Sequence, residues 1–465
     1  MITYNFGIVG LGVMGRNLLL NMADHGFAVA GLDLDQEKAD SLQAEAQEDH
    51  SVFATVKPED FVKSLEQPRA IMLLVPAGAP VDGAIKTLLP FLDEGDIIID
   101  GGNTYFTDTD RRYKELSSKE IHFFGMGISG GESGARRGPS MMPGGDKIAY
   151  ERLRPIFEAI AAKVDGEPCV EFLGNGSAGN YVKMVHNCIE YGIMQLIAET
   201  YDIMKNVYHL DHETIQQLFE QWNKEELNSF LIEITADILK QKEGDEHLVD
   251  LISDWAKSKG TGKWTSQNAM DLQVPVPVID AAVNMRDMSK YKLERIQASA
   301  LLKWNKEENI SNANLDDLKK GLYFAIITTY AQGLAQLKIA SEIYGYDLNL
   351  ETICKIWRGG CIIRAILLED FRQAFATESD LPNVMLDKHI AEKLNTTQSS
   401  IRTVLKDTIQ NGTPASAWMN ALSYFDAYRS EKLPTNLIQA QRDFFGAHTY
   451  ERIDKDGIFH TRWES

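Results

Sequence analysis

The stretch Gly10-Leu-Gly-Val-Met-Gly15 decides the first fold assignment, because it lies between a short apolar run and a helical pattern. Phe6–Val9 predicts a strand, and residues 16–25 predict the helix that the glycines open. In such a loop Gly10 allows the tight turn, Gly12 lets a pyrophosphate approach the backbone, and Gly15 permits close helix packing. The stretch therefore predicts a dinucleotide-binding βαβ unit with the phosphates at the helix N-terminus.

Four more apolar runs continue this alternation and predict a parallel sheet with strands at 28–32, 70–75, 96–100 and 122–126. Asp33 ends the second strand, 21 residues past Gly12, where a ribose-binding carboxylate is expected. Cofactors bind at the carboxyl ends of such strands. The predicted cofactor contacts are Gly10, Leu11, Gly12, Val13, Met14, Gly15, Asp33, Leu34, Asp35, Val75, Pro76, Ala77 and Asn103.

The pattern changes at the loop 174–179, beyond which long helical stretches follow with almost no strand-like alternation. We therefore expect an α/β Rossmann domain (1–176), a large all-α domain (177–434) and an extended tail (435–465) that reaches a partner subunit. The helical part carries a weak repeat. Tyr208, Leu210, Glu213, Thr214 and Ile215 recur 138 residues later as Tyr346, Leu348, Glu351, Thr352 and Ile353, which indicates an internal duplication.

Composition narrows the class of protein. The net charge of −20 argues against non-specific binding to nucleic acid or anionic lipid, so an anionic ligand needs a locally positive pocket. Cysteines 169, 188, 354 and 361 have no metal-type spacing and are expected as free thiols, with no metal. The N-terminus resembles no signal peptide and no apolar run is long enough to span a membrane, so we expect a cytoplasmic enzyme.

The helical pattern after residue 180 carries the candidate catalytic groups. Lys183, His186, Asn187 and Glu190 occupy positions i, i+3, i+4 and i+7 and so share one helix face, while the other positions are mostly apolar. A polar stripe on so apolar a helix is expected to line a cleft. Lysine acts as a base only when it is neutral, and glutamate acts as an acid only when it is protonated, so such a pair suits proton transfer at two carbons.

Glycine-rich and basic segments predict the substrate pocket. The loop from Gly127 through Ser129, Gly130 and Gly131 to Gly134 is richer in glycine than a turn requires, and lets a polyhydroxy substrate lie against the backbone. Basic residues follow at Lys259, Lys263, Arg286, Arg442 and His448. Taken individually, such residues are more typical of a solvated surface.

The sequence resembles the 6-phosphogluconate dehydrogenase family over nearly its whole length. The resemblance is carried by GLGVMGRNL (10–18), DIIIDGGN (96–103), GISGGESGAR (127–136), VKMVHNCIEYG (182–192), KGTGKW (259–264) and LIQAQRDFFGAHTYER (437–452). It implies oxidation of 6-phosphogluconate at C3, then decarboxylation to ribulose 5-phosphate, without a metal, in the pentose phosphate pathway. It also implies a homodimer.

The resemblance assigns roles residue by residue. Lys183 is the implied general base at the C3 hydroxyl, and Glu190 the implied acid that protonates C1 of the enediol. The implied substrate contacts are Asn103, Ser129, Gly130, Gly131, His186, Asn187, Tyr191, Lys259, Thr261 and Arg286, with Arg442 and His448 supplied by the tail of the second subunit.

The cofactor sequence departs from the family pattern at one place. NADP-specific members typically read Asn-Arg-Thr after the second strand, whereas this chain reads Asp33-Leu34-Asp35. A carboxylate there hydrogen-bonds the ribose hydroxyls, and NADP binding usually needs an arginine. We therefore predict NAD as the preferred cofactor, with NADP as the alternative and Lys38 as the cation that could swing in.

Two other functions fit part of the pattern. A hydroxyacid dehydrogenase of the β-hydroxyisobutyrate type shares the layout and a catalytic lysine, but it is shorter and has no role for Glu190 or the basic tail. A non-catalytic dinucleotide sensor would not need Lys183 and Glu190 on one helix face.

Overall fold

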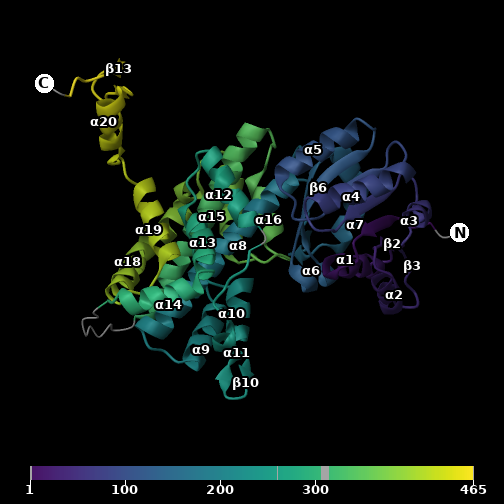
Figure 1. The fold of residues 1–465 in the computed structure, drawn as a ribbon, viewed down its shortest axis with the longest axis horizontal. Coiled ribbons are helices and arrows are strands. Elements are labelled where there is room, and N and C mark those ends of the chain that lie inside the picture. The colour runs from purple at the N-terminus through teal and green to yellow at the C-terminus, as the bar shows by residue number, and fades with distance from the viewer. Residues whose placement is uncertain (1–2, 259, 305–313, 464–465) are drawn as a thin grey trace.

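The computed structural model describes residues 3–258, 260–304 and 314–463. Figure 1 shows a sheet with its helices at one end of the molecule, in purple and blue, and a helical body at the other. This arrangement confirms the predicted Rossmann domain followed by an all-α domain.

The N-terminal sheet has seven strands in the order β3-β2-β1-β4-β5-β6-β7, and only the β6–β7 pair is antiparallel. The strands are β1 Phe6–Val9, β2 Val29–Leu32, β3 Val52–Thr55, β4 Ala70–Leu73, β5 Ile97–Asp100, β6 His122–Ser129 and β7 Ser140–Gly145. The five predicted strands are confirmed within a few residues, whereas β3 and β7 were not predicted. Neighbours β2 and β4 flank β1 and form the switch point where ligands bind in such sheets.

Helices cover both faces of this sheet and bury a core on each. One core joins the sheet to α1 Val13–Asp24, α2 Gln36–Glu45 and α7 Lys147–Ile160, and the other joins it to α3 Pro58–Ser64, α4 Ala79–Leu88 and α5 Phe106–Ser117. Helix α1 begins three residues earlier than predicted, because the last glycine of the loop, Gly15, already adopts helical geometry. The short helix α6 Gly131–Arg137 follows β6.

The helical body surrounds two long helices, α8 Ala178–Asp202 and α15 Leu315–Tyr344, which pack on one another. The other helices are α9 His212–Trp222, α10 Phe230–Lys240, α11 Leu248–Leu251, α12 Thr261–Asp271, α13 Pro277–Ser289, α14 Lys292–Leu301, α16 Leu350–Trp357, α17 Leu367–Thr377, α18 Lys388–Gln410 and α19 Ser416–Tyr428. Helix α8 is buried around most of its circumference, as its apolar sequence predicts.

The predicted repeat has a structural counterpart. His209 and Asp347, 138 positions apart, are both non-glycine residues with positive φ (55° and 61°). Two residues later Asp211 and Asn349 cap α9 and α16 by accepting hydrogen bonds from the N–H groups of Thr214 and Thr352. Matching turns and caps at one spacing agree with the duplication.

The tail is less extended than predicted, because it contains helix α20 Thr435–Gly446 and the ladder of β12 Tyr450–Glu451 with β13 Ile458–Phe459. The buried Asp443 carboxylate holds these pieces together by accepting hydrogen bonds from Thr449 N, Thr461 N, His460 and Trp463. Although burial acts to raise it, these bonds hold the pKa of Asp443 below its usual range. Figure 1 shows α20 standing clear of the helical body.

Within the described ranges, no helix combines the length and the hydropathy that crossing a membrane requires.

Candidate active site

A largely apolar cavity of about 650 Å³ lies at the carboxyl ends of β1, β2 and β4. Its lining includes Gly10, Gly12, Asp33, Leu34, Val75 and Pro76, all predicted cofactor contacts, together with Lys38. The structure therefore brings the glycine loop, the acidic strand end and the strand exit at Val75 and Pro76 to one cavity, as a dinucleotide requires.

The three glycines of the loop differ in backbone geometry and in their surroundings. Gly10 has a φ of 96°, and a Cβ on Gly15 would lie 1.9 Å from the Gly10 carbonyl oxygen. A Cβ on Gly12 would meet nothing within 4 Å. Gly10 and Gly15 thus pack the turn, while Gly12 faces open space at the N-terminus of α1, where a pyrophosphate fits.

Asp33 organises the edge of this cavity. Its carboxylate accepts hydrogen bonds from Leu11 N at 2.7 Å and Asp35 N at 3.0 Å, and lies 3.4 Å from Lys38 Nζ. Although partial burial acts to raise it, these N–H groups and the Lys38 ammonium lower the pKa of Asp33. Leu34 is 96% exposed, and Asp35 caps α2 by accepting from Glu37 N.

Helix α8 is held unusually close to the sheet, and this contact places Lys183. A Cβ on Gly127 of β6 would lie 2.3 Å from Lys183 Cβ, and a Cβ on Gly179 would lie 2.3 Å from the Met142 carbonyl oxygen. Only glycine permits this approach. As a result the Lys183 side chain is buried beside the loop that follows β6.

The predicted polar stripe is a connected cluster. His186 is fully buried, and its Nδ1 lies 3.5 Å from Lys183 Nζ and 4.0 Å from Glu190 Oε2. Its Nε2 lies 3.3 Å from Ser129 Oγ. At the cavity side, Asn187 Nδ2 donates to Asn103 Oδ1 over 3.5 Å. The structure thus joins α8 to the ends of β5 and β6.

Burial shifts the acid–base groups in the directions that proton transfer needs. Desolvation lowers the pKa of Lys183 to about 8, although the Glu190 carboxylate acts to raise it. Burial raises the pKa of Glu190, against the nearby Lys183 and Arg286 charges. Burial and the Lys183 charge lower the pKa of His186 well below its usual value, so its imidazole is neutral. Near neutral pH the cluster therefore offers a neutral histidine and a lysine that loses its proton readily.

The other predicted substrate residues lie on several different elements. Ser129 is buried, and Gly130 (φ 120°) caps the short helix α6 with Gly131 at its first position. Thr261 opens α12, and the Arg286 guanidinium lies 3.4 Å from the centroid of the Tyr191 ring. Lys259 lies outside the described residues.

Two predicted contacts lie apart from this cluster. Arg442 and His448 are exposed on the tail, and Arg442 donates only to Gln439 among the residues described. Because α20 stands clear of the body (Figure 1), they do not reach the α8 cluster within one chain.

The turn that follows α16 was not predicted from the sequence. Gly360 O accepts a hydrogen bond from Ser140 N, and Ile362 N donates to Ser129 Oγ. These two bonds attach the turn to both ends of the loop between β6 and β7. The Cys361 thiol is buried nearby and interacts electrostatically with Lys183. The adjacent glycines Gly359 and Gly360 were the feature of the sequence that could have indicated this turn.

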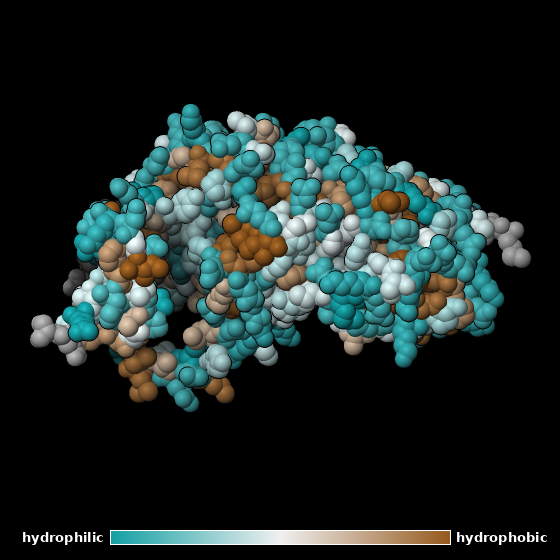
Figure 2. All heavy atoms as spheres, turned by 90° about the horizontal axis from the view of Figure 1, so that it is seen from above, coloured by the Kyte–Doolittle hydropathy of each residue, from teal (hydrophilic) through white to brown (hydrophobic). Residues whose placement is uncertain are grey.

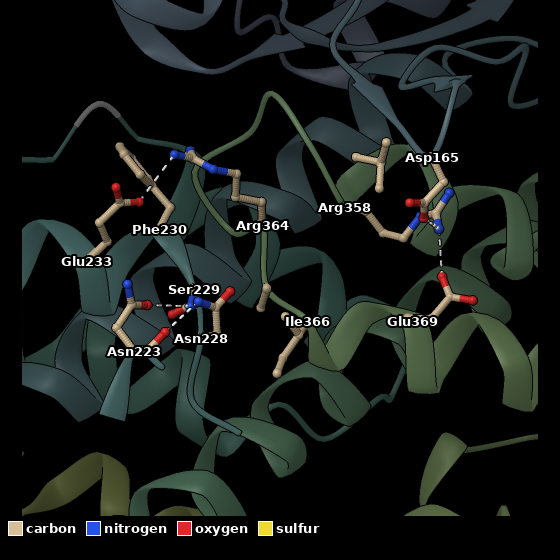
Figure 3. A pocket seen from close by; sticks show the side chains of 12 residues that line it. Asp165, Asn223, Asn228, Ser229, Phe230, Glu233, Arg358, Arg364, Ile366 and Glu369 are labelled. Carbon is tan, nitrogen blue, oxygen red and sulfur yellow. Dashed lines mark hydrogen bonds and ion pairs between the residues drawn. The ribbon is translucent and has the colours of Figure 1, made fainter. Parts of the chain in front are cut away.

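Figure 3 shows another cavity, lined by Arg358 and Arg364 among others. Its volume is about 380 Å³. No predicted site residue lines it, and its charged groups already pair with one another, as Arg358 does with Glu369 and Arg364 with Glu233. No group of three or more potential metal ligands occurs within the described part of the chain.

The fold is that of an oxidoreductase that binds a dinucleotide on a Rossmann domain, and the polar cluster on the buried helix α8 of the second domain is its candidate active site. Residues 5–174 match the description "NAD binding domain of 6-phosphogluconate dehydrogenase", and residues 179–463 match "6-phosphogluconate dehydrogenase, C-terminal domain". The chain belongs to the 6-phosphogluconate dehydrogenase family.

Individual relatives agree over their full length. The decarboxylating 6-phosphogluconate dehydrogenase of Lactococcus lactis subsp. cremoris is 52% identical and covers 99% of this chain and 98% of its own. The NADP(+)-dependent enzyme of Bacillus subtilis is 50% identical, with 98% of both chains covered. The solved Plasmodium falciparum enzyme, described in apo form and with NADP+ and with 6-phosphogluconate, has a TM-score of 0.95 at 42% identity and covers 99% of this chain and 100% of its own.

Proposed function

We propose that this chain catalyses the oxidative decarboxylation of 6-phosphogluconate to ribulose 5-phosphate and CO2, with reduction of NAD(P). The observation that carries the proposal is the buried Lys183, whose pKa is lowered to about 8, on the same helix face as the partly buried Glu190. The reaction needs one group that removes a hydroxyl proton and another that returns a proton to carbon.

The chain's own residues supply these steps. When bound, the nicotinamide accepts the hydride from C3. Neutral Lys183 removes the C3 hydroxyl proton, and its ammonium then polarises the 3-keto oxygen while CO2 leaves. Glu190 protonates C1 of the enediol that results. Ser129, Gly130 and Gly131 orient the sugar acid together with His186, Asn187 and Asn103. The buried Ser129, Lys183 and His186 exclude water from the reacting atoms, whereas Asn103 and Gly131 are exposed.

We extend the proposal to the phosphate end and the domain limits. Tyr191, Lys259, Thr261 and Arg286 hold the phosphate, where cations are needed against a net charge of −20. We keep the predicted domain boundaries, which are 1–176 for the Rossmann domain, 177–434 for the helical domain and 435–465 for the tail. Family membership supports a cytoplasmic enzyme of the pentose phosphate pathway.

The direct test incubates the protein with 6-phosphogluconate and either NAD or NADP, and measures reduced cofactor and CO2. Equal amounts of both products are expected. Reduced cofactor without CO2 would point to a simple hydroxyacid dehydrogenase, and cofactor binding without either product would point to a sensor.

The tail completes the site of a partner subunit in this proposal. Leu437, Ile438, Phe444 and Phe445 of α20 are 55–72% exposed, more apolar surface than one isolated helix keeps in water. Figure 2 shows hydrophobic patches scattered over a largely hydrophilic surface. A homodimer buries them and brings Arg442 and His448 to the partner's phosphate site, where arginine suits bidentate contact.

Mixing an Arg442→Ala chain with a Lys183→Met chain tests this arrangement. In the hybrid dimer one site carries both defects and the other carries neither, so activity is expected to return in that fraction. Each variant alone is the control. Absence of recovery, with hybrid dimers demonstrated by native mass spectrometry, would contradict the shared site.

We also propose that the enzyme prefers NAD to NADP. Asp33 holds a lowered pKa, so an ionised carboxylate faces the ribose edge, and Leu34 supplies no cation. A 2′-phosphate beside this carboxylate is disfavoured, and even about 1.4 kcal/mol of repulsion gives tenfold discrimination.

Measuring kcat/KM for both cofactors decides this point, with Asp33→Asn/Leu34→Arg/Asp35→Thr as the comparison. The parent is expected to favour NAD and the triple variant to shift toward NADP. A parent that favours NADP, as the name of the Bacillus subtilis relative indicates for that enzyme, would contradict the proposal and direct attention to Lys38.

A further inference from the structure

A fully buried ion pair lies between the loop after β4, which lines the cofactor cavity, and the loop after β5. Asp100 ends β5 and is 0% exposed, and Arg112 lies on α5 and is 1% exposed. Arg112 Nη1 donates to Asp100 Oδ2 over 3.2 Å. Removing two charges from water is costly and adds little net stability, so a pair placed here calls for another explanation.

The Asp100 carboxylate shapes the loop after β5. Its Oδ1 accepts from Gly102 N at 3.1 Å, and its Oδ2 accepts from Thr104 Oγ1 at 2.8 Å. Asn103, the predicted cofactor and substrate contact, lies between these two donors. The carboxylate therefore fixes the backbone on both sides of Asn103.

The Arg112 guanidinium shapes the loop after β4 in the same way. Its Nη2 donates to the Gly78 carbonyl oxygen at 3.0 Å, and its Nε donates to Asp82 Oδ1 at 2.8 Å. Gly78 caps α4 directly after the predicted contacts Val75, Pro76 and Ala77. One planar guanidinium thus holds both loops, which the single nitrogen of a lysine does not allow.

The catalytic helix is attached to the same loop. The side chain of Asn180 on α8 makes both contacts. Its Nδ2 donates to the Gly102 carbonyl oxygen over 3.3 Å, and its Oδ1 accepts a hydrogen bond from Thr109 Oγ1 of α5. The spacing between the two loops is therefore tied to the position of α8 and of Lys183.

We propose that Asp100 and Arg112 are positioning residues that set the two loops around the nicotinamide half of the cofactor, and so set the distance over which hydride transfer occurs. Neither Asp100 nor Arg112 lines the cavity that contains Asp33, and Asp33 belongs to the adenosine half. The proposal rests on the proposed function only for the identity of the hydride donor.

The test separates the two halves of the cofactor. Binding of NADH and of ADP is measured by fluorescence and calorimetry, without 6-phosphogluconate, for the parent, Arg112→Met and Arg112→Lys. Loss of charged hydrogen bonds to both loops is expected to weaken NADH binding about tenfold and leave ADP binding unchanged. With C3-deuterated 6-phosphogluconate, the isotope effect on kcat is expected to increase, because hydride transfer becomes slower.

Arg111→Met is the matched control. Arg111 is the neighbour on α5 and also pairs with Asp82, but its side chain is 50% exposed. It is expected to leave both affinities unchanged. Thr104→Val is the second test variant, to be used if the Arg112 variants do not fold. It keeps the ion pair, removes one hydrogen bond to Asp100, and is expected to weaken NADH binding about threefold without changing ADP binding.

Equal weakening of NADH and ADP, or no weakening of either, would overturn the proposal, as would the same loss in Arg111→Met. Because nucleotide binding is measured without sugar acid, failure to oxidise 6-phosphogluconate would contradict the proposed function and leave this result intact.

Discussion

The two ends of α8 each bury an ionisable side chain, but they treat it differently. Near the start of α8, the Lys183 ammonium has one polar contact among the described residues. This contact, to His186 Nδ1, is 3.5 Å long, which is at the limit of a hydrogen bond. Near the end, the Glu199 carboxylate accepts hydrogen bonds from Ala417 N, Trp418 N and Gln195 at 3.0–3.1 Å. Both residues are at most 6% exposed.

This difference in hydrogen bonding distinguishes Lys183, which must exchange a proton during the reaction, from Glu199, which keeps the same hydrogen-bond donors. Glu199 is enclosed by donors at the N-terminus of α19, where the free N–H groups and the helix dipole favour a carboxylate. Lys183 is buried without such partners, which makes its charge costly and its proton easy to remove. Incomplete pairing therefore marks the reactive end of the helix, and complete pairing marks the supporting end.

The largest effect is expected from Lys183→Met. Loss of the base is expected to lower kcat about 10²–10⁴-fold. Stability is not expected to fall, because an incompletely paired buried cation is replaced by an apolar chain of similar length. Turnover and thermal unfolding, measured at one protein concentration, check both statements. Near-normal turnover would refute the role as base, and a large loss of stability would refute the contrast with Glu199.

Lys205→Met is the control for this change. Lys205 lies just beyond α8, pairs with Asp250 at 2.6 Å and is 35% exposed, so its loss is expected to change neither turnover nor stability appreciably. In the parent, kcat/KM is expected to rise with pH and level off above about 8, because the neutral amine is the active form and the pKa of Lys183 is lowered to about 8.

A smaller effect is expected from Glu190→Gln, which lies between the two extremes on the same helix. Glutamine keeps the shape and removes the proton that C1 receives, so turnover is expected to fall about 10²-fold. Hydride transfer precedes this step, so a first-turnover burst of reduced cofactor is expected to persist in stopped-flow measurements. A burst lost together with turnover would place Glu190 before hydride transfer.

Local periodicity explains what could be predicted from the sequence. The glycine loop, the strand before it and Asp33 lie within one βαβ unit, and the spacing of Lys183 to Glu190 fixes their common helix face. Strand β7 was missed because Ser-Met-Met-Pro-Gly-Gly (140–145) is typical of a loop, and only its antiparallel pairing with β6 makes it a strand.

Contacts between distant segments explain what could not. Ser129 and His186 are 57 residues apart, and no local pattern indicates that they meet. Glu199 has the sequence context of any helical glutamate, because the backbone N–H groups that distinguish it, those of Ala417 and Trp418, are more than 200 residues away. Arg112 is likewise indistinguishable in sequence from its exposed neighbour Arg111.

The smallest effect on turnover is expected from Glu199→Gln, which changes the pH dependence of stability instead. Burial raises the pKa of Glu199 from 4.5 to about 7, although the N–H groups of Ala417 and Trp418 act to lower it. A carboxyl whose pKa is raised on folding stabilises the protein below its unfolded pKa, and that contribution is lost as the pH rises through its folded pKa. The parent is therefore expected to lose on the order of 3 kcal/mol of unfolding free energy between about pH 4.5 and 7 from this group.

Glutamine does not titrate, so the melting temperature of the variant relative to the parent is expected to rise between pH 5 and 8, at equal protein concentration. Glu392→Gln, on the exposed face of α18, is the control and is expected to show no such trend. A constant difference across this range would mean that Glu199 stays ionised throughout, and a fall in turnover equal to that of Glu190→Gln would mean that the two ends of α8 are not functionally distinct.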